Sequence, residues 1–368
     1  MFGEQDLKSL LEFQSPHPVL SVYVSAEPTE KGAESMRRKL RALLREIDGR
    51  AEQDVEAVER YFEHGFSGTG RTVAAFSCAP AGYFRAFSFQ IGIRSRIRLM
   101  PRPYVKPLAD LMNAYGGCGV AQIDKQEERL FHFHLGELIS HRDVSGEEVH
   151  RPRGGQASAG PGRREGKAGQ TRRGEELTQR NMRRFAETAG EFFQEARVRR
   201  ILLAGTEENL SLFRSYLPAA WQPTVAGTFA ASKATRPAVI LAKALEVGAR
   251  TEQERVARLV ETAVTAAAKG KGGAIGLDDT LGALRGGRVQ VLLVSDGYRE
   301  KGFECSGCGF HTAQAVQVCP FCGNPFRVIE DAVEHAVQTV MLGEGEVEII
   351  RGNPDLERAG RIAAILRY

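Results

Sequence analysis

The spacing of hydrophobic residues predicts alternating strands and helices in the first third of the chain. Val19–Val24 has the pattern of a strand, and an apolar face recurs at helical spacing from Met36 to Ile47. Prolines then mark a linker, at Pro101, Pro103 and Pro107. The other expected elements are a helix over Val55–Phe62 and strands over Thr72–Ser77 and Tyr83–Ile93.

The middle third shows the same alternation. An apolar helix face is expected at Met182, Phe185, Ala186, Ala189 and Phe193. The other expected elements are strands over Val120–Asp124, Arg129–Leu135 and Arg200–Gly205, and a helix over Pro237–Val247. Alternating strands and helices imply an α/β sandwich.

The last third predicts a third α/β region. A short helix is expected to begin at Asp278 or Asp279, because aspartate is a preferred residue at a helix N-terminus. The other expected elements are helices over Glu252–Ala268 and Asp331–Met341 and strands over Val289–Val294, Glu346–Ile350 and Ile362–Leu366. The fold class is therefore α/β (α+β). We expect domains over 1–112, 113–248 and 249–368.

Composition narrows the class of protein. The chain has 368 residues, of which 42% are hydrophobic, as in ordinary globular proteins of two or three domains. Met1–Phe13 carries charges throughout and does not resemble a signal peptide. The sequence has no apolar run of the ~18 residues that a membrane span needs. We therefore expect a cytoplasmic protein.

Four of the six cysteines form two Cys-x2-Cys pairs, each followed by glycine. This spacing brings two thiolates together on each tight turn, and two such turns make a tetrahedral zinc site. A disulfide pair or a redox site is the alternative, although disulfides are disfavoured in the cytosol. We predict a structural zinc ribbon over 303–328, and the isolated Cys78 and Cys118 as small packed residues. The predicted zinc ligands are Cys305, Cys308, Cys319 and Cys322.

Basic charge is concentrated in one segment. Arg151–Arg184 contains ten Arg or Lys and three Glu, a net charge of +7, whereas the whole chain carries only +4. Such blocks are either solvated surfaces or nucleic-acid contacts. Arg151–Glu175 has seven glycines and no apolar periodicity, so a long loop is expected there. Arg94, Arg96 and Arg98 alternate along an extended segment, as in a phosphate contact or an edge strand protected by charge.

The tripeptide Gly154-Gly155-Gln156 lies within this basic segment. Two glycines allow a close approach of the backbone to another molecule, and the glutamine offers a backbone N–H and a neutral amide. Such a tip can hold a water or an oxyanion but has no general base of its own. A flexible surface turn is the alternative. His132 and His134 share a strand face without an evident third metal ligand, so we interpret them as surface residues of that strand.

Four stretches in order resemble archaeal and eukaryotic class 1 peptide chain release factors. His150–Gln156 resembles the tip of their middle domain, and Gly119–Asp124 its first strand. Gly276–Leu284 and Gly360–Tyr368 resemble the opening helix and the last strand of their third domain. The likeness covers residues 113–368 and implies a three-domain architecture with the ribbon inserted in the third domain.

The chain departs from this family in two ways, and its whole pattern more closely resembles the bacterial branch of the superfamily. A Gly- and Arg-rich insertion, Ala159–Gly174, separates the tripeptide from the following helix. The Asn-Ile-Lys-Ser motif that these factors use near the stop codon is absent, and Asp48–Asp54 stands in its place. Stop-codon reading by that route is therefore not expected.

The resemblance implies a ribosome-dependent peptidyl-tRNA hydrolase that rescues stalled or terminating ribosomes. Gly154, Gly155 and Gln156 would act on the ester in the large subunit, beside ribosomal RNA and peptidyl-tRNA. A translational GTPase is an implied partner of the third domain. The alternatives are a non-catalytic binder of the ribosomal A site, as in hibernation, and an RNA-binding regulator unrelated to release. The expected RNA contacts are Arg151, Arg153, Arg163, Arg164, Lys167, Arg172, Arg173, Arg180, Arg183 and Arg184.

Overall fold

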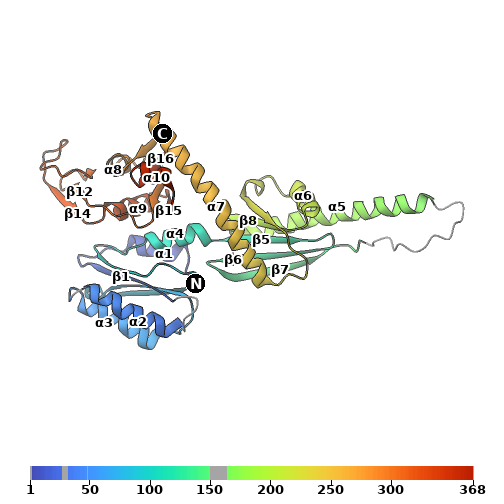
Figure 1. Ribbon diagram of the computed structural model, residues 1–368, viewed down its shortest axis with the longest axis horizontal. Helices are drawn as coiled ribbons and strands as arrows, with labels where there is room; N and C mark the ends of the chain where they lie inside the picture. The colour runs from blue at the N-terminus through green and yellow to red at the C-terminus, as the bar shows by residue number, and fades with distance from the viewer. Residues whose placement is uncertain (1, 27–31, 48, 150–163, 368) are drawn as a thin grey trace. The chain divides into compact units, whose positions relative to one another are not determined.

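The computed structural model describes residues 2–26, 32–47, 49–149 and 164–367 (Figure 1). These residues form two compact units. One unit combines Met1–Asn113 with Glu254–Tyr368, and the other is Ala114–Gln253. The expected mixed α/β fold class is confirmed. The N-terminal and C-terminal segments of the chain pack together in the first unit. The division into three domains therefore stays a prediction.

The N-terminal part of the first unit is an antiparallel sheet with helices on one face. The strand order is β3-β2-β1-β4, with β1 at Val19–Ser25, β2 at Thr72–Cys78, β3 at Tyr83–Phe89 and β4 at Arg96–Met100. Helices α2 (Gly32–Leu44) and α3 (Glu52–Arg60) bury Met36, Leu40 and Val58 against the sheet. Helix α1 (Glu4–Glu12) precedes the first strand.

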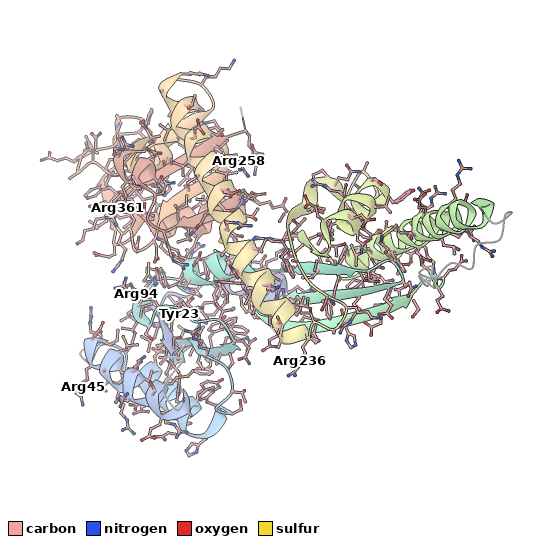
Figure 2. All side chains as sticks on the ribbon, turned by 45° about the vertical axis from the view of Figure 1, so that its right-hand side comes forward. Tyr23, Arg45, Arg94, Arg236, Arg258 and Arg361 are labelled. Atoms are coloured by element: carbon pink, nitrogen blue, oxygen red, sulfur yellow. The ribbon has the colours of Figure 1, made fainter. Side chains whose placement is uncertain are left out.

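The segment expected to be a linker is instead buried structure. Tyr104, Val105 and Lys106 are each at most 3% exposed, and helix α4 (Lys106–Tyr115) follows directly. Tyr23, in the interior of this unit in Figure 2, donates its hydroxyl to the Tyr104 carbonyl at 2.5 Å. The prolines interrupt regular structure only briefly, because Tyr104, Val105 and Leu108 are apolar and buried.

The same buried segment joins the two ends of the chain. The Lys106 Nζ donates to the Tyr298 carbonyl at 3.1 Å, and the Glu334 carboxylate accepts from the Val105 N–H at 3.0 Å. Arg96 is only 13% exposed and lies 3.9 Å from Asp296. Arg96 is therefore a contact within this unit, neither a phosphate ligand nor an exposed edge charge.

The C-terminal part of this unit is an α/β/α sandwich, in agreement with the third α/β region that the sequence predicts. Its sheet has the order β10-β16-β11-β15, with β10 at Gly273–Ile275, β11 at Val289–Ser295, β15 at Glu346–Ile350 and β16 at Ile362–Leu366. Helices α8 (Leu277–Leu284) and α9 (Ala332–Leu342) cover one face. Helix α10 (Pro354–Arg358) and the end of α7 (Pro237–Ala268) cover the other.

The second unit is a five-stranded mixed sheet between helices. The order is β7-β6-β5-β8-β9, with β5 at Cys118–Ile123, β6 at Glu127–His134, β7 at Glu137–Ser145, β8 at Arg200–Gly205 and β9 at Val225–Phe229. Strands β5, β8 and β9 are parallel. Helices α5 (Arg164–Glu195) and α6 (Glu207–Tyr216) pack on one face, and the first half of α7 packs on the other.

Two sequence predictions about helices were wrong. The loop expected to reach Glu175 ends earlier, because α5 already begins at Arg164. Extending an anchored helix needs no new nucleus, so helix formers such as Arg, Glu and Lys offset the intervening glycines. The helices expected over Pro237–Val247 and Glu252–Ala268 are one continuous helix, α7, since Gly248 only weakens a helix and no proline interrupts it.

Pattern reading also missed α1, α4, α6, α10, β7 and β9. Both isolated cysteines pack as expected: Cys78 is fully buried, and burial raises the pKa of the Cys118 thiol to about 11.

No helix in the described part of the chain is both long and apolar enough to cross a membrane.

Candidate nucleic-acid interface and metal centre

Helix α5 is fixed to its sheet by an apolar face. Met182, Phe185 and Phe193 are fully buried against strand residues that include Ala121 and Leu203. This is the face that the sequence predicts. Burying side chains of this size stabilises the docked helix by about 1.5–3 kcal/mol each.

A buried asparagine adds a polar anchor that the sequence did not reveal. Asn181 is 3% exposed, and its Oδ1 accepts from the Glu147 N–H at 2.7 Å. Its Nδ2 donates to the carbonyls of Lys125 and Glu147 at 3.0 and 2.9 Å. Gly146 makes room, since an added Cβ there would lie 2.5 Å from the Asn181 side chain. The only sequence signal is a short polar residue next to Met182 on the buried face.

The opposite face of α5 presents arginines to solvent. Arg180 lies 3.1 Å from Glu147, but both side chains are about half or more exposed, so this pair stabilises little. The guanidinium of Arg183 lies 5.4 Å from the ring centre of Tyr216. The exposed arginines on the described side chains of α5 are Arg172, Arg173, Arg180, Arg183 and Arg184.

The remaining predicted residues of this site cannot be placed in the same way. Gly154, Gly155 and Gln156 lie outside the described residues, together with Arg151, Arg153 and Arg163. Arg164 and Lys167 belong to the first turns of α5, although their side chains are not described. The catalytic tripeptide and these five RNA contacts stay predictions.

The histidines of β6 hold no metal constellation. His134 accepts a hydrogen bond from the Gly117 N–H through Nδ1 at 3.2 Å. Among the described residues, the group of His, Cys, Asp or Glu that comes close enough to hold a metal is the set of four cysteines.

The four cysteines come together in a small separate sheet. Strands β12 (Gly302–Cys305), β13 (His311–Thr312) and β14 (Phe326–Ile329) form it. The four Sγ atoms lie within 4.8 Å of one another, with Cys305–Cys322 at 3.3 Å and Cys308–Cys319 at 3.5 Å. The glycines after each pair, Gly309 and Gly323, have φ of +67° and +72°, so the tight turns need glycine.

These distances fit the tetrahedral coordination of one metal ion by the four sulfurs. Zinc–sulfur bonds of about 2.3 Å place tetrahedral sulfurs roughly 3.8 Å apart, whereas a disulfide needs about 2.05 Å. The thiolate form is also favoured at Cys322. Hydrogen bonds from Asn324 lower the pKa of the Cys322 thiol to about 6, and the Gly307 N–H donates to the Cys305 sulfur at 3.4 Å. The donor set therefore fits a closed, four-thiolate metal site.

The ribbon is tied to the C-terminal sandwich by Asp278. Its carboxylate accepts from the Thr312 hydroxyl at 2.7 Å and from the Ala313 N–H at 2.9 Å. Asp278 was expected to cap α8, but the N-cap residue is Gly276, so no side chain caps this helix. Asp278 lies inside the first turn, and its side chain serves the ribbon.

Comparison with known proteins relates this arrangement to one family. Residues 103–249 match the family described as bacterial archaeo-eukaryotic release factor family 10. This match agrees with the predicted resemblance to the bacterial branch of the archaeal and eukaryotic release-factor superfamily.

Three of the matching solved structures illustrate how distant the similarity is. The archaeal termination factor aRF1 shares 15% identity, with 100% of this chain and 99% of that chain covered and a TM-score of 0.28. Archaeoglobus fulgidus Pelota shares 14%, with 99% and 92% covered and a TM-score of 0.33. S. cerevisiae Dom34 shares 8%, with 81% and 79% covered and a TM-score of 0.43. The search of curated proteins gives no match.

Proposed function

We propose that this protein is a ribosome-dependent peptidyl-tRNA ester hydrolase that releases nascent peptide from stalled or terminating ribosomes. The family match supports a ribosome-associated role in termination or rescue. The observation that carries the finer proposal is α5. This helix follows Gly154-Gly155-Gln156 in sequence, is anchored through Asn181 and an apolar face, and presents arginines on its free side.

The tripeptide supplies the chemistry in this proposal. Gly154 and Gly155 admit the backbone to the peptidyl-tRNA ester without a Cβ in the way. Gln156 positions the attacking water, and its backbone N–H stabilises the developing oxyanion. One such donor is worth about 3 kcal/mol, or 10²–10³ in rate. The other catalytic groups belong to the ribosome.

The arginines provide binding and orientation. Contacts to phosphate position a protein on RNA without reading its sequence. The exposed face at Arg172, Arg173, Arg180, Arg183 and Arg184 would therefore hold the tip against large-subunit RNA. Because the stop-codon motif is absent from the sequence, release would not need a stop codon.

The four cysteines would hold one structural Zn²⁺. With Cys305, Cys308, Cys319 and Cys322 as ligands, the coordination is complete and no position is open for substrate. The ion would stabilise the ribbon and supply no catalysis. The implied GTPase partner and the cytoplasmic location belong to this same proposal.

The decisive functional test uses ribosomes stalled on messages without a stop codon and carrying labelled peptidyl-tRNA. The protein should release peptide from them at a rate well above spontaneous hydrolysis, and equally with or without a stop codon in the A site. Free peptidyl-tRNA should be a poor substrate, since the ribosome supplies the remaining groups. Tight ribosome binding without release would instead establish the non-catalytic A-site binder.

A further inference from the structure

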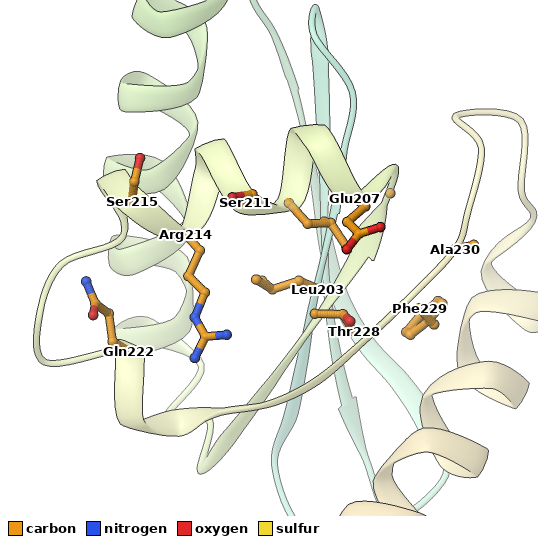
Figure 3. A pocket seen from close by; sticks show the side chains of 11 residues that line it. Leu203, Glu207, Ser211, Arg214, Ser215, Gln222, Thr228, Phe229 and Ala230 are labelled. Atoms are coloured by element: carbon orange, nitrogen blue, oxygen red, sulfur yellow. The ribbon is translucent and has the colours of Figure 1, made fainter.

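A groove of about 720 Å³ lies in the second unit between α6 and the edge of the sheet. Its floor is apolar, formed by Leu203 of β8 and Leu210 of α6. Ser211 and Thr228 line its walls (Figure 3). The volume is in the range of ligand pockets in proteins. The proposed release activity uses none of these residues.

The two ends of the groove carry opposite charges. Glu207 and Arg214 both line it, two helical turns apart on one side of α6. In Figure 3, Arg214 lies beside Gln222 at one end, and Glu207 lies toward Phe229 and Ala230 at the other. Both charged residues are exposed, and within the described residues neither forms an ion pair or a side-chain hydrogen bond. Seven helical residues span about 10 Å.

Residues of strand β9, which lies at the edge of the sheet, line one side of the groove. Strand β9 is the last strand of the sheet, and no described strand pairs with its outer side. An edge strand offers free N–H and C=O groups to an added strand. Three residues of extended chain span about 10 Å, close to the rise of α6 between Glu207 and Arg214.

We propose that this groove binds an extended peptide segment as an added strand on β9. Because β9 runs parallel to β8 and α6 runs back between them, Arg214 lies near the start of β9 and Glu207 near its end. A strand antiparallel to β9 therefore brings its C-terminal end to Arg214 and its N-terminal end to Glu207. The partner segment carries a carboxylate at its C-terminal end and a basic group about three residues earlier, with small apolar residues between.

Charge order favours a peptide over a phosphate ligand. A phosphate compound would meet Arg214 but would be repelled by Glu207 at the other end. A short extended peptide satisfies both ends and the free backbone edge together. Main-chain bonds to the strand give affinity in this mode of recognition, and the flanking charges give direction.

The test selects from a library of random hexapeptides displayed with free C-termini, using the full-length protein as bait. Selected peptides should share an acidic C-terminal end preceded by a basic residue. An enriched peptide, synthesised with a fluorescent label, should bind at least tenfold more weakly to Arg214→Glu. Arg250→Glu, an exposed arginine on α7 outside the groove, is the matched control and should not change binding.

A charge swap makes the test independent of folding effects. The double variant Glu207→Arg with Arg214→Glu should select peptides with the reversed charge order. The proposal is overturned if no peptide is enriched, or if Arg214→Glu enriches the same peptides. It is equally overturned if inorganic phosphate or a uridine oligonucleotide, and no peptide, binds in a manner that depends on Arg214.

Discussion

The cysteine ribbon and the basic face of α5 differ in how much of each site the chain itself completes. In the ribbon, two glycine turns bring four sulfurs within 4.8 Å, so the chain supplies the whole ligand set. On α5, the arginines stand exposed on a helix whose other face is anchored in the core. The ribbon has a defined geometry by itself, whereas in the proposed function the basic face of α5 acts only when it binds a polyanion. Variants should therefore affect the first through folding and the second through binding.

Removing a cysteine ligand should have the largest effect. The wild-type protein should contain one zinc ion per chain, and Cys308→Ser should lower this content to near zero and unfold the ribbon. Zinc contributes about 10–16 kcal/mol to comparable small metal domains. Peptide release should remain largely intact, because the ribbon contains none of the residues Gly154, Gly155 and Gln156 to which the chemistry is assigned. Metal analysis of purified protein measures this, with Cys118→Ser as the control that keeps its zinc. A protein without zinc, or with a Cys305–Cys322 disulfide under reducing conditions, would refute the site.

Loss of the polar anchor of α5 should come next. Asn181→Ala leaves the Glu147 N–H and the carbonyls of Lys125 and Glu147 without their partner. Each unpaired buried group costs about 1–3 kcal/mol, so the second unit should lose roughly 3 kcal/mol. Denaturant unfolding followed by hydrogen exchange in α5 measures the loss. Gln179→Ala, an exposed neighbour, should change stability by less than about 0.5 kcal/mol. Equal effects of the two substitutions would show that Asn181 is no anchor.

Reversing charges on α5 should weaken ribosome binding and leave folding unchanged. Arg180→Glu with Arg184→Glu should lower affinity at least tenfold and flatten its salt dependence, since fewer counterions are released. Binding titrations at several salt concentrations measure both quantities. Arg250→Glu on α7 serves as the control for charge reversal outside α5, with half the charge change of the double variant. If the double variant binds with unchanged affinity and salt slope, the arginines form a solvated face only.

The smallest effect concerns a buried acid in the first unit. Burial raises the pKa of Glu334 to about 8, whereas an unfolded glutamate titrates near 4.3. Between these values the folded state keeps a proton that the unfolded state has lost, so stability should fall as pH rises through this window. The nearby Lys106, whose pKa burial lowers, acts in the opposite direction. Glu334→Gln should therefore reduce the loss of melting temperature between pH 5 and pH 8. A larger loss in the variant would contradict the buried neutral acid.

How well the sequence predicted each region follows from the range of the forces involved. The cysteine spacing is local, and the apolar face with Phe185 and Phe193 repeats at one period. The sequence therefore predicts both the clustering of the four cysteines and the buried face of α5. Asn181 and the buried Lys106 gain their roles from partners distant in the chain, which no local pattern shows. Strand β9 and α6 were missed because short, half-exposed elements carry little periodic signal. Asp278 binds Thr312 of the ribbon instead of capping α8. Helix α7 continues through Gly248, although glycine weakens a helix.

The most direct test of the central claim compares release with binding for one glycine. Gly155→Ala should abolish peptide release from stalled ribosomes while ribosome affinity changes less than about twofold, because one methyl group blocks close approach at the tip but not docking by the arginines. Gly160→Ala, in the same segment but outside the tripeptide, should release peptide at the wild-type rate. Release by Gly155→Ala at the wild-type rate would contradict the proposed role of the tripeptide and the hydrolase function with it.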